Sequence, residues 1–333
     1  MPELSTQHKT DMTNTPGKGC CPVCGSNGAG KWLEAPDRFH GRPQLYQLLR
    51  CSSCSLVWLD NPPRPENMGE HYGPDYYRLI SKAGETSPER WRGYGRTLSR
   101  YKRSGALLDL GCSSGAFLTS LKGQAWQLNG IEISAPSAEK ARARSGAQVF
   151  VGDIVEAPFP PESFDVITSF DVLEHLYHPR QTMEKVWEWL KPDGIFYVVI
   201  PNILSWEARI FRSYWYGLEL PRHLSHFSPE SLRNLLASVG FREESLETPP
   251  IHYLEYSTRY LCDDILRKVG FSRPPLSAGT NPGIPWRVVR KALRLTILAL
   301  FGGTASLAGA GPSMEAIFRK GSRPNPAKEG SAS

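Results

Sequence analysis

The strongest constraint on the fold of this 333-residue chain is a short segment in which an apolar run meets an acidic residue and then two spaced glycines. The segment is residues 107–118, LLDLGCSSGAFL, and its glycines are Gly111 and Gly115. Such glycines let a strand turn tightly into a helix, and they allow a ligand to approach the backbone where the helix offers free N–H groups. By itself the segment predicts either a nucleotide-cofactor loop or an ordinary glycine turn in a doubly wound domain.

Further strand-like segments downstream also end in acidic residues. Glu132 closes a short apolar segment about twenty residues after the first acid, the position of a carboxylate that binds ribose hydroxyls. Asp153 follows residues 148–151, and Asp171 follows residues 164–170. In an open parallel sheet these strand ends share one rim, where ligands bind at the switch in strand order. The pattern therefore predicts an α/β, Rossmann-like fold with a ligand at this rim.

Residues 107–200, and above all the DVLEHL segment at 171–176, resemble the class I S-adenosylmethionine (SAM)-dependent methyltransferases with a VLEHL-type motif. The resemblance implies a seven-stranded sheet and SAM as cofactor. A loop would surround the methionine part of SAM, an acid would hold the ribose, and further residues would flank the adenine and lie beneath the sulfonium. In chain order this set is Asp109, Gly111, Ser113, Gly115, Glu132, Ile133, Asp153, Ile154, Phe170 and Asp171.

One residue departs from the family pattern, because Ser113 stands where a middle glycine is common. A dehydrogenase is the nearest alternative to a methyltransferase. The loop lacks the third glycine of the dinucleotide fingerprint, and the DVLEHL segment has no place in that fingerprint. Both features favour the methyltransferase interpretation.

Two Cys-x-x-Cys pairs ahead of the core predict a zinc ribbon. Cys21 and Cys24 form the first pair, and Cys51 and Cys54 form the second. Four thiolates close a tetrahedral Zn²⁺ shell and leave no position for a substrate, so the predicted site is structural. Four free cysteines are the alternative, and folding would then be insensitive to chelators. Cys20 is interpreted as a spare thiol.

The composition of the chain predicts seven parts. Closely spaced prolines at 61–65 indicate a stiff linker, and the aromatic segment 71–77 either folds over the cofactor, as the resemblance implies, or packs a linker onto the core. The predicted parts are a disordered tail (1–19), the zinc ribbon (20–60), a linker with a helical and aromatic segment (61–104), the SAM-binding core (105–248), a helical insertion or lid (249–311), the final strand (312–320) and a second disordered tail (321–333).

Two histidines after the fifth predicted strand are candidates for a catalytic base. His223 and His226 lie in the segment RHLSHF, and a histidine at the corresponding place serves as base in the sugar methyltransferases that the segment resembles. A neutral imidazole can take the proton of an acceptor hydroxyl as the methyl group arrives. The alternative is a histidine that only orders a loop, because positioning alone can support methyl transfer. His175 and His178 are interpreted as supporting or surface residues, and the chemistry is expected to need no metal.

Charge and hydropathy limit the partners. The net charge of +6 comes without a block of consecutive Lys or Arg, so we expect no nucleic-acid partner, although RNA is the second candidate acceptor. Residues 286–308 join basic and apolar stretches, which predicts either peripheral contact with a membrane surface or a lid or dimer-forming helix pair. We see no apolar run long enough for a spanning helix, and we expect a cytoplasmic protein that is either free in the cytoplasm or peripheral to the inner membrane face.

The sequence thus predicts a SAM-dependent methyltransferase whose acceptor is a small molecule or a glycan. We expect methylation of a hydroxyl on a sugar, a lipid-linked glycan or a secondary metabolite, by analogy with the proteins that the chain resembles. An RNA methyltransferase that grips its substrate with the zinc ribbon is the alternative enzyme. A non-catalytic SAM-binding protein is the third hypothesis, and the oligomeric state is left open.

Overall fold

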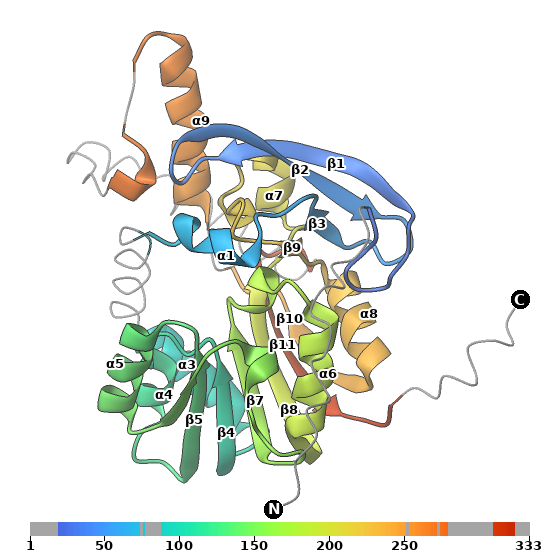
Figure 1. Ribbon diagram of the computed structural model, residues 1–333, viewed down its shortest axis with the longest axis vertical. Coiled ribbons are helices and arrows are strands. Elements are labelled where there is room, and N and C mark those ends of the chain that lie inside the picture. Colours follow the sequence, from blue (N-terminus) through green and yellow to red (C-terminus); the bar gives the residue numbers. More distant parts are fainter. Residues whose placement is uncertain are drawn as a thin grey trace, which may run out of the picture.

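The computed structural model describes residues 19–73, 76, 88–250, 253–271, 274–278 and 309–323. These residues form two sheets, a seven-stranded one and a four-stranded one (Figure 1). Both predicted tails, apart from a few residues, lie outside the described residues, and so does the segment 286–308, predicted to contact a membrane surface or to form a lid or dimer-forming helix pair.

The larger sheet is mostly parallel, with the order β10-β11-β8-β7-β4-β5-β6. From β4 the chain proceeds outward through β5 and β6, and it then returns to place β7 and β8 on the other side of β4. The switch in strand order therefore lies between β4 and β7. The strands are β4 (Gly105–Leu110), β5 (Trp126–Glu132), β6 (Gln148–Val151), β7 (Phe164–Phe170), β8 (Leu190–Pro201), β10 (Phe241–Glu247) and β11 (Ser313–Lys320).

Helices cover both faces of this sheet, because alternate side chains of each strand point to opposite faces. On β8, Phe196 and Val198 pack in one cluster with α6 (Pro179–Trp189) and α8 (Pro229–Val239). Tyr197 and Val199 pack in a second cluster with the helices of the opposite face, α3 (Pro88–Ser99), α4 (Ala116–Ser120) and α5 (Ala135–Ser145). The arrangement is a Rossmann-like methyltransferase fold, as the sequence predicts.

The smaller sheet joins the N-terminal region to a segment of the core, and its strand order is β1-β2-β3-β9. Its first three strands come from the N-terminal region and are β1 (Ala29–Asp37), β2 (Arg42–Cys51) and β3 (Val57–Leu59). The fourth, β9 (Ser225–His226), belongs to the segment between the core strands and α8. Val57 pairs with His226, and Trp58 pairs with Ser225. The N-terminal sheet therefore contains one of the two predicted base residues.

Further helices and turns connect these elements. They are α1 (Pro65–Met68), α7 (Trp206–Phe211) and α9 (Leu254–Lys268), with the 3-10 turns η1 (Gly69–His71), η2 (Ile154–Glu156), η3 (Leu173–His175), η4 (Arg212–Tyr214), η5 (Tyr216–Leu218) and η6 (Leu276–Ala278). None of the helices within the described residues is both long enough and apolar enough to cross a membrane.

Candidate active site

The loop after β4 is tied to the end of β5 by the carboxylate of Glu132. One oxygen of Glu132 accepts a hydrogen bond from the backbone N–H of Ser113 at 2.9 Å, and the other accepts one from the N–H of Ser134 at 2.8 Å. We call the loop and the acidic strand ends the cofactor rim: Gly111, Ser113, Gly115, Glu132 and Asp171. Both Glu132 oxygens retain acceptor capacity, because a carboxylate oxygen has two lone pairs. Glu132 is thus held in place while it can still bind hydroxyl groups.

The two glycines of the loop are required by the protein's own packing. Gly111 has a φ of 60°, and a Cβ at this position would lie 2.6 Å from a Val172 methyl group. Gly115 has a φ of 73°, and its Cβ would lie 2.8 Å from the Cα of Ala141 on α5. Ser113 also has a positive φ, 49°, although it carries a side chain. Ser113 therefore keeps a positive φ at the position where a glycine is common.

Asp109 lies beneath the loop, inside the sheet. Its carboxylate accepts a hydrogen bond from the Thr168 hydroxyl at 2.6 Å and is only 4% exposed. Burial raises the pKa of Asp109 to about 7, partly opposed by the Thr168 hydrogen bond and assisted by the charge of Glu132. Asp109 joins β4 to β7 at the switch point, so it supports the rim from below.

Two apolar residues of the predicted cofactor set differ sharply in exposure. Ile133 is 71% exposed beside the end of β5, whereas Ile154 is 7% exposed and packs in the core. Asp153 uses one carboxylate oxygen to accept a hydrogen bond from the Val155 N–H at 2.9 Å, which caps η2. Of the two isoleucines, only Ile133 presents an apolar side chain that a ligand at the rim can cover.

Phe170 and Asp171 end β7 next to the loop. Phe170 stacks on Tyr94 of α3, with ring centroids 4.7 Å apart, and meets Phe117 edge to face at 4.8 Å. Asp171 has a φ of 57° and forms an ion pair with Arg90, also on α3, at 2.6 Å. The helix α3 therefore covers the end of β7 and fixes both side chains.

Beyond Asp171, the structure brings together two segments that are distant in sequence. We call Glu174, His175, His223 and His226 the histidine cluster. The His175 and His223 ring centroids lie 4.6 Å apart, and those of His223 and His226 lie 6.2 Å apart. The backbone N–H of Leu224 donates to the carbonyl of Glu174 at 2.8 Å, which fixes the two segments to each other. The cluster is therefore continuous with the cofactor rim through η3.

Both predicted base residues are buried and hydrogen-bonded to backbone carbonyls. His226 is 3% exposed, and its Nε2 lies 3.0 Å from the carbonyl of Leu218, while its Nδ1 is buried without a hydrogen-bond partner. His223 is 5% exposed, with Nδ1 2.9 Å from the carbonyl of Gly217 and Nε2 3.4 Å from a Glu219 oxygen. Burial lowers the pKa of His226 to about 4 and that of His223 well below its ordinary value. Both imidazoles are neutral at pH 7.

Glu174 is the most unusual group of the cluster, because it is 2% exposed and neither of its carboxylate oxygens has a hydrogen-bond partner. Burial raises its pKa well above the ordinary value, and the nearby charge of Asp171 acts in the same direction. His175 has its Nδ1 3.0 Å from the carbonyl of Arg222 and 3.0 Å from the Tyr72 hydroxyl. His175, predicted to be a supporting or surface residue, lies beside His223.

A buried arginine connects this cluster to the N-terminal sheet. The Arg222 Nε donates to Glu219 at 3.1 Å, and its Nη1 donates to the carbonyl of His71 at 3.3 Å. Its guanidinium lies over the Phe39 ring, 4.6 Å from the centroid. Phe39 is part of the turn between β1 and β2, so the tip of this hairpin packs directly against the segment that carries both predicted base residues.

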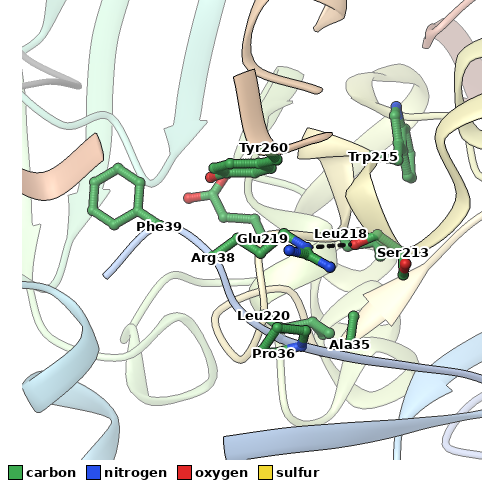
Figure 2. Close-up of a pocket in the computed structure, with 10 residues that line it drawn as sticks. All are labelled: Ala35, Pro36, Arg38, Phe39, Ser213, Trp215, Leu218, Glu219, Leu220 and Tyr260. Carbon is green, nitrogen blue, oxygen red and sulfur yellow. Dashed lines mark hydrogen bonds between the residues drawn. The ribbon is translucent and has the colours of Figure 1, made fainter. Parts of the chain in front are cut away.

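A small cavity lies between the hairpin and the segment 213–220 (Figure 2). Its volume is about 10 Å³, room for roughly one water molecule. Arg38 closes one side by donating from Nε to the carbonyl of Ser213 at 3.0 Å. The cavity is too small for an organic acceptor, so it is a packing feature of the interface between the hairpin and the core.

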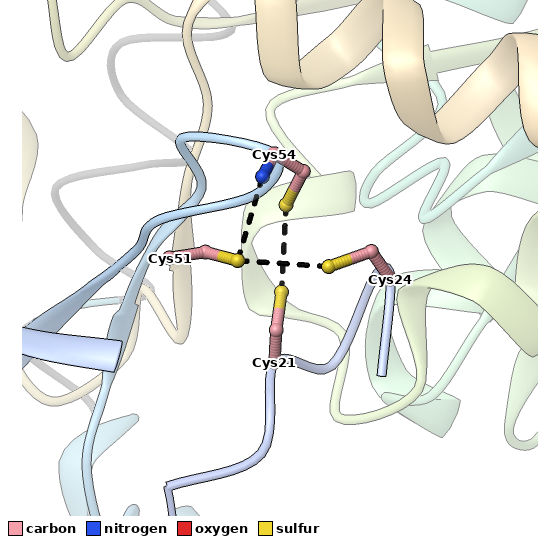
Figure 3. Close-up of side chains that lie close together, drawn as sticks. All are labelled: Cys21, Cys24, Cys51 and Cys54. Carbon is pink, nitrogen blue, oxygen red and sulfur yellow. Dashed lines mark hydrogen bonds between the residues drawn. The ribbon is translucent and has the colours of Figure 1, made fainter. Parts of the chain in front are cut away.

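The four cysteines of the two Cys-x-x-Cys pairs converge at one point (Figure 3). The Sγ atoms of Cys21 and Cys54 are 3.5 Å apart, and those of Cys24 and Cys51 are 3.6 Å apart. Zn–S bonds of about 2.3 Å in a tetrahedron place the sulfur atoms about 3.8 Å apart, so the set fits a single Zn²⁺. The Cys54 N–H also points at the Cys51 sulfur at 3.4 Å, a contact that stabilises a thiolate. Cys20 lies outside the set and contacts the carbonyl of Gly25.

Residues 85–246 match the sequence profile of a family described as a methyltransferase domain. The chain carries a class I methyltransferase domain. A protein of Mycolicibacterium smegmatis named "Probable S-adenosylmethionine-dependent methyltransferase" is 27% identical over 142 residues, which cover 41% of this chain and 52% of the relative. A ubiquinone biosynthesis O-methyltransferase of Idiomarina loihiensis is 32% identical over 108 residues, 30% of this chain and 44% of the relative. The chain thus spans about half the length of these curated relatives.

Solved structures resemble this methyltransferase domain at a lower level. A SAM-dependent methyltransferase from Archaeoglobus fulgidus is 19% identical, with a TM-score of 0.49, and the match covers 74% of this chain and all of the other. A possible histamine N-methyltransferase, so titled, from Thermotoga maritima is 19% identical with a TM-score of 0.47, over 74% of this chain and 98% of the other. At such scores the likeness carries no argument about the acceptor.

Sequence reasoning missed three members of the site that the methyltransferase domain presents. Glu174 was recognised only as part of a motif, although a carboxylate that ends a buried apolar stretch signals a special environment. Arg222 and Glu219 carry no local signal, because each is one charged residue in a loop. Their roles follow only from burial and from mutual contact.

Proposed function

We propose that this protein is a SAM-dependent methyltransferase that methylates a hydroxyl group of a small molecule, which we expect to be a sugar, a lipid-linked glycan or a secondary metabolite. The observation that carries the proposal is the junction of two groups of residues within a methyltransferase domain. The cofactor rim lies at the switch point between β4 and β7, and a buried histidine cluster begins three residues after its last acid.

The residues of the rim support SAM binding in a specific way. We propose that Glu132 holds the ribose hydroxyls, since its two oxygens are already oriented by the N–H groups of Ser113 and Ser134. Ile133 would cover the adenine with its exposed side chain. Asp153 and Ile154 would contribute the neighbouring backbone, and Phe170 with Asp171 would lie beneath the sulfonium. Asp109 would support the loop from beneath through Thr168.

Bound SAM supplies an electrophilic methyl group on sulfur. The acceptor oxygen attacks that methyl carbon, so a C–O bond forms as the C–S bond breaks, and the electron pair of that bond stays on sulfur. The acceptor's proton must then move to a base. We propose His226 or His223 for this role, because both imidazoles are neutral at pH 7. The unpartnered Nδ1 of His226 supports His226 in particular, since it has a lone pair available.

We further propose that the four cysteines bind a structural zinc ion. The zinc ribbon would support the part of the site that receives the acceptor and would not bind a nucleic acid. Two of the ribbon's arginines are engaged within the protein: Arg38 binds the carbonyl of Ser213, and Arg42 contacts His71. Phosphate contacts need free cationic side chains, which these arginines do not offer. This observation favours a small-molecule acceptor over the alternative, RNA.

The test is transfer of a labelled methyl group from SAM into an extract that is afterwards separated into lipid, RNA and small-molecule fractions. We expect label in the lipid or small-molecule fraction. Label in RNA would replace the proposed acceptor class with the alternative. SAM binding measured by calorimetry without any transfer in any fraction would instead identify a non-catalytic SAM-binding protein.

A further inference from the structure

Within the histidine cluster, three ligand atoms lie within 4.8 Å of one another: one oxygen of Glu174 and one ring nitrogen each of His175 and His223. No hydrogen bond joins the three side chains. Ligand atoms around one metal ion at about 2.1 Å are roughly 3 to 3.5 Å apart, so side-chain adjustments of about 1 Å would complete the set. We infer that Glu174, His175 and His223 form a binding site for a divalent metal ion, separate from the four-cysteine site.

The burial of Glu174 points to a metal ion. Its carboxylate is fully enclosed, and neither oxygen has a donor within hydrogen-bond distance. A buried carboxylate without partners costs several kcal/mol, and protonation would not remove the problem because the added O–H would itself need an acceptor. A metal ion would satisfy the carboxylate directly.

The two imidazoles are held as metal-binding histidines are. The Nδ1 of His223 contacts the carbonyl of Gly217 at 2.9 Å, and the Nδ1 of His175 contacts the carbonyl of Arg222 at 3.0 Å. If Nδ1 carries the hydrogen in both rings, each Nε2 has a lone pair, and that of His223 also lies 3.4 Å from a Glu219 oxygen. Metal-binding histidines commonly donate their other N–H to a backbone carbonyl in this manner, which fixes the ring orientation before the ion arrives.

The ion pairs around the cluster also favour a bound cation. Asp171 is paired with Arg90, and Glu219 is paired with Arg222, so Glu174 is the carboxyl group among these three that has no ion-pair partner of its own. A divalent cation would neutralise it. Two imidazoles with one carboxylate suit Zn²⁺, Mn²⁺ or Fe²⁺ and leave coordination positions open for an oxygen ligand.

A role for the metal rests on the proposed function. An acceptor hydroxyl that occupied an open position would lose its proton more easily, because the cation stabilises the oxyanion. His223 would then act as a ligand, and His226, with its unpartnered Nδ1, would receive the proton. The structure thereby assigns different tasks to the two candidate base residues.

Titration with Mn²⁺ of the full chain loaded with one equivalent of zinc, which fills the four-cysteine site, followed by electron paramagnetic resonance, tests the site. Mn²⁺ prefers oxygen and nitrogen ligands over thiolates, so the four-cysteine site does not contribute to the signal. We expect one bound Mn²⁺ per chain, and an affinity at least about 10-fold lower in Glu174→Gln and in His223→Gln. His178→Gln is the matched control, since His178 lies outside the cluster, and it should bind as the unmodified chain does.

Elemental analysis after dialysis against Zn²⁺ gives a second measurement that does not depend on a variant: two zinc ions per chain support the proposal. A single zinc ion together with no Mn²⁺ binding would overturn it, as would Mn²⁺ binding that Glu174→Gln leaves unchanged. SAM affinity, measured on each variant, confirms that the fold persists. Metal binding without methyl transfer would refute the proposed function but not the metal site. Methyl transfer by a chain that binds no second metal would refute the metal site but not the proposed function.

Discussion

The cofactor rim and the histidine cluster lie next to each other but are built in opposite ways. Each rim residue ends or follows the strand that places it, and the parallel sheet alone brings the strand ends together. The histidine cluster combines η3 with the segment around β9, and β9 itself is held by β3 of the N-terminal sheet. A rim made of strand ends depends on the core sheet, whereas the cluster depends on a second module that must dock correctly.

The largest expected effect follows from this dependence. Replacing Cys24 by Ser, which removes one ligand of the ribbon metal, should abolish methyl transfer and leave SAM affinity within about 3-fold, because a structural zinc ion contributes about 10 kcal/mol or more to the folding of its module. Turnover and calorimetric SAM binding are measured on the same sample. Cys20→Ser, outside the four-cysteine set, is the control. Equal loss of both properties would show that the two regions are not separable.

The next effect concerns the base. His226→Gln should lower kcat by roughly 10²- to 10⁴-fold, the usual contribution of general base catalysis, while SAM affinity stays unchanged. Steady-state rates at saturating SAM measure this, with His178→Gln as the control. A His226→Gln variant that turns over at the unmodified rate would remove His226 from the chemistry.

On the rim, Glu132→Gln should weaken SAM binding by roughly 10- to 100-fold, because hydrogen bonds to a charged group are worth about 1.5–3 kcal/mol. The variant should keep most of its kcat once SAM is saturating. Calorimetry compares it with Glu139→Gln, which removes an exposed carboxylate from α5. If kcat falls as strongly as SAM affinity, the rim also helps to orient the acceptor.

The smallest effect is a pH dependence of stability. The pKa of Asp109 is about 7 in the folded chain against a model value of 3.8, so the folded state holds an extra proton between these values. Stability should therefore decrease as pH rises from about 5 to 7, with a slope of at most about 1.4 kcal/mol per pH unit from this group. Asp109→Asn should flatten the slope.

Urea unfolding at pH 5, 6 and 7 measures this contribution. Asp60→Asn serves as the control, because the Asp60 side chain lies outside both regions. A slope that is identical in the unmodified chain and in Asp109→Asn would mean that the carboxylate is already ionised when buried, and the rim would then be less protected from water than the structure indicates.

Much of the fold could be predicted because its signals are local. Residues 107–118 contain a strand, a turn and the start of a helix in one run, and the alternation along β8 is readable from its apolar stretch. The close contacts that require glycine at positions 111 and 115 could not be predicted from the sequence, since Val172 and Ala141 approach these glycines from other elements. The same holds for Ile154, whose side chain enters the core rather than the rim.

The sequence by itself determined the strand ends that form the rim, the methyltransferase fold and the two cysteine pairs, because each of these depends on residues a few positions apart. Only the tertiary structure decided that β9 completes the N-terminal sheet, that Arg222 lies against Phe39, and that Glu174 meets His175 and His223 without a hydrogen bond. These contacts join segments up to about 180 residues apart. Burial and charge compensation are properties of the assembled neighbourhood, so no local pattern encodes them.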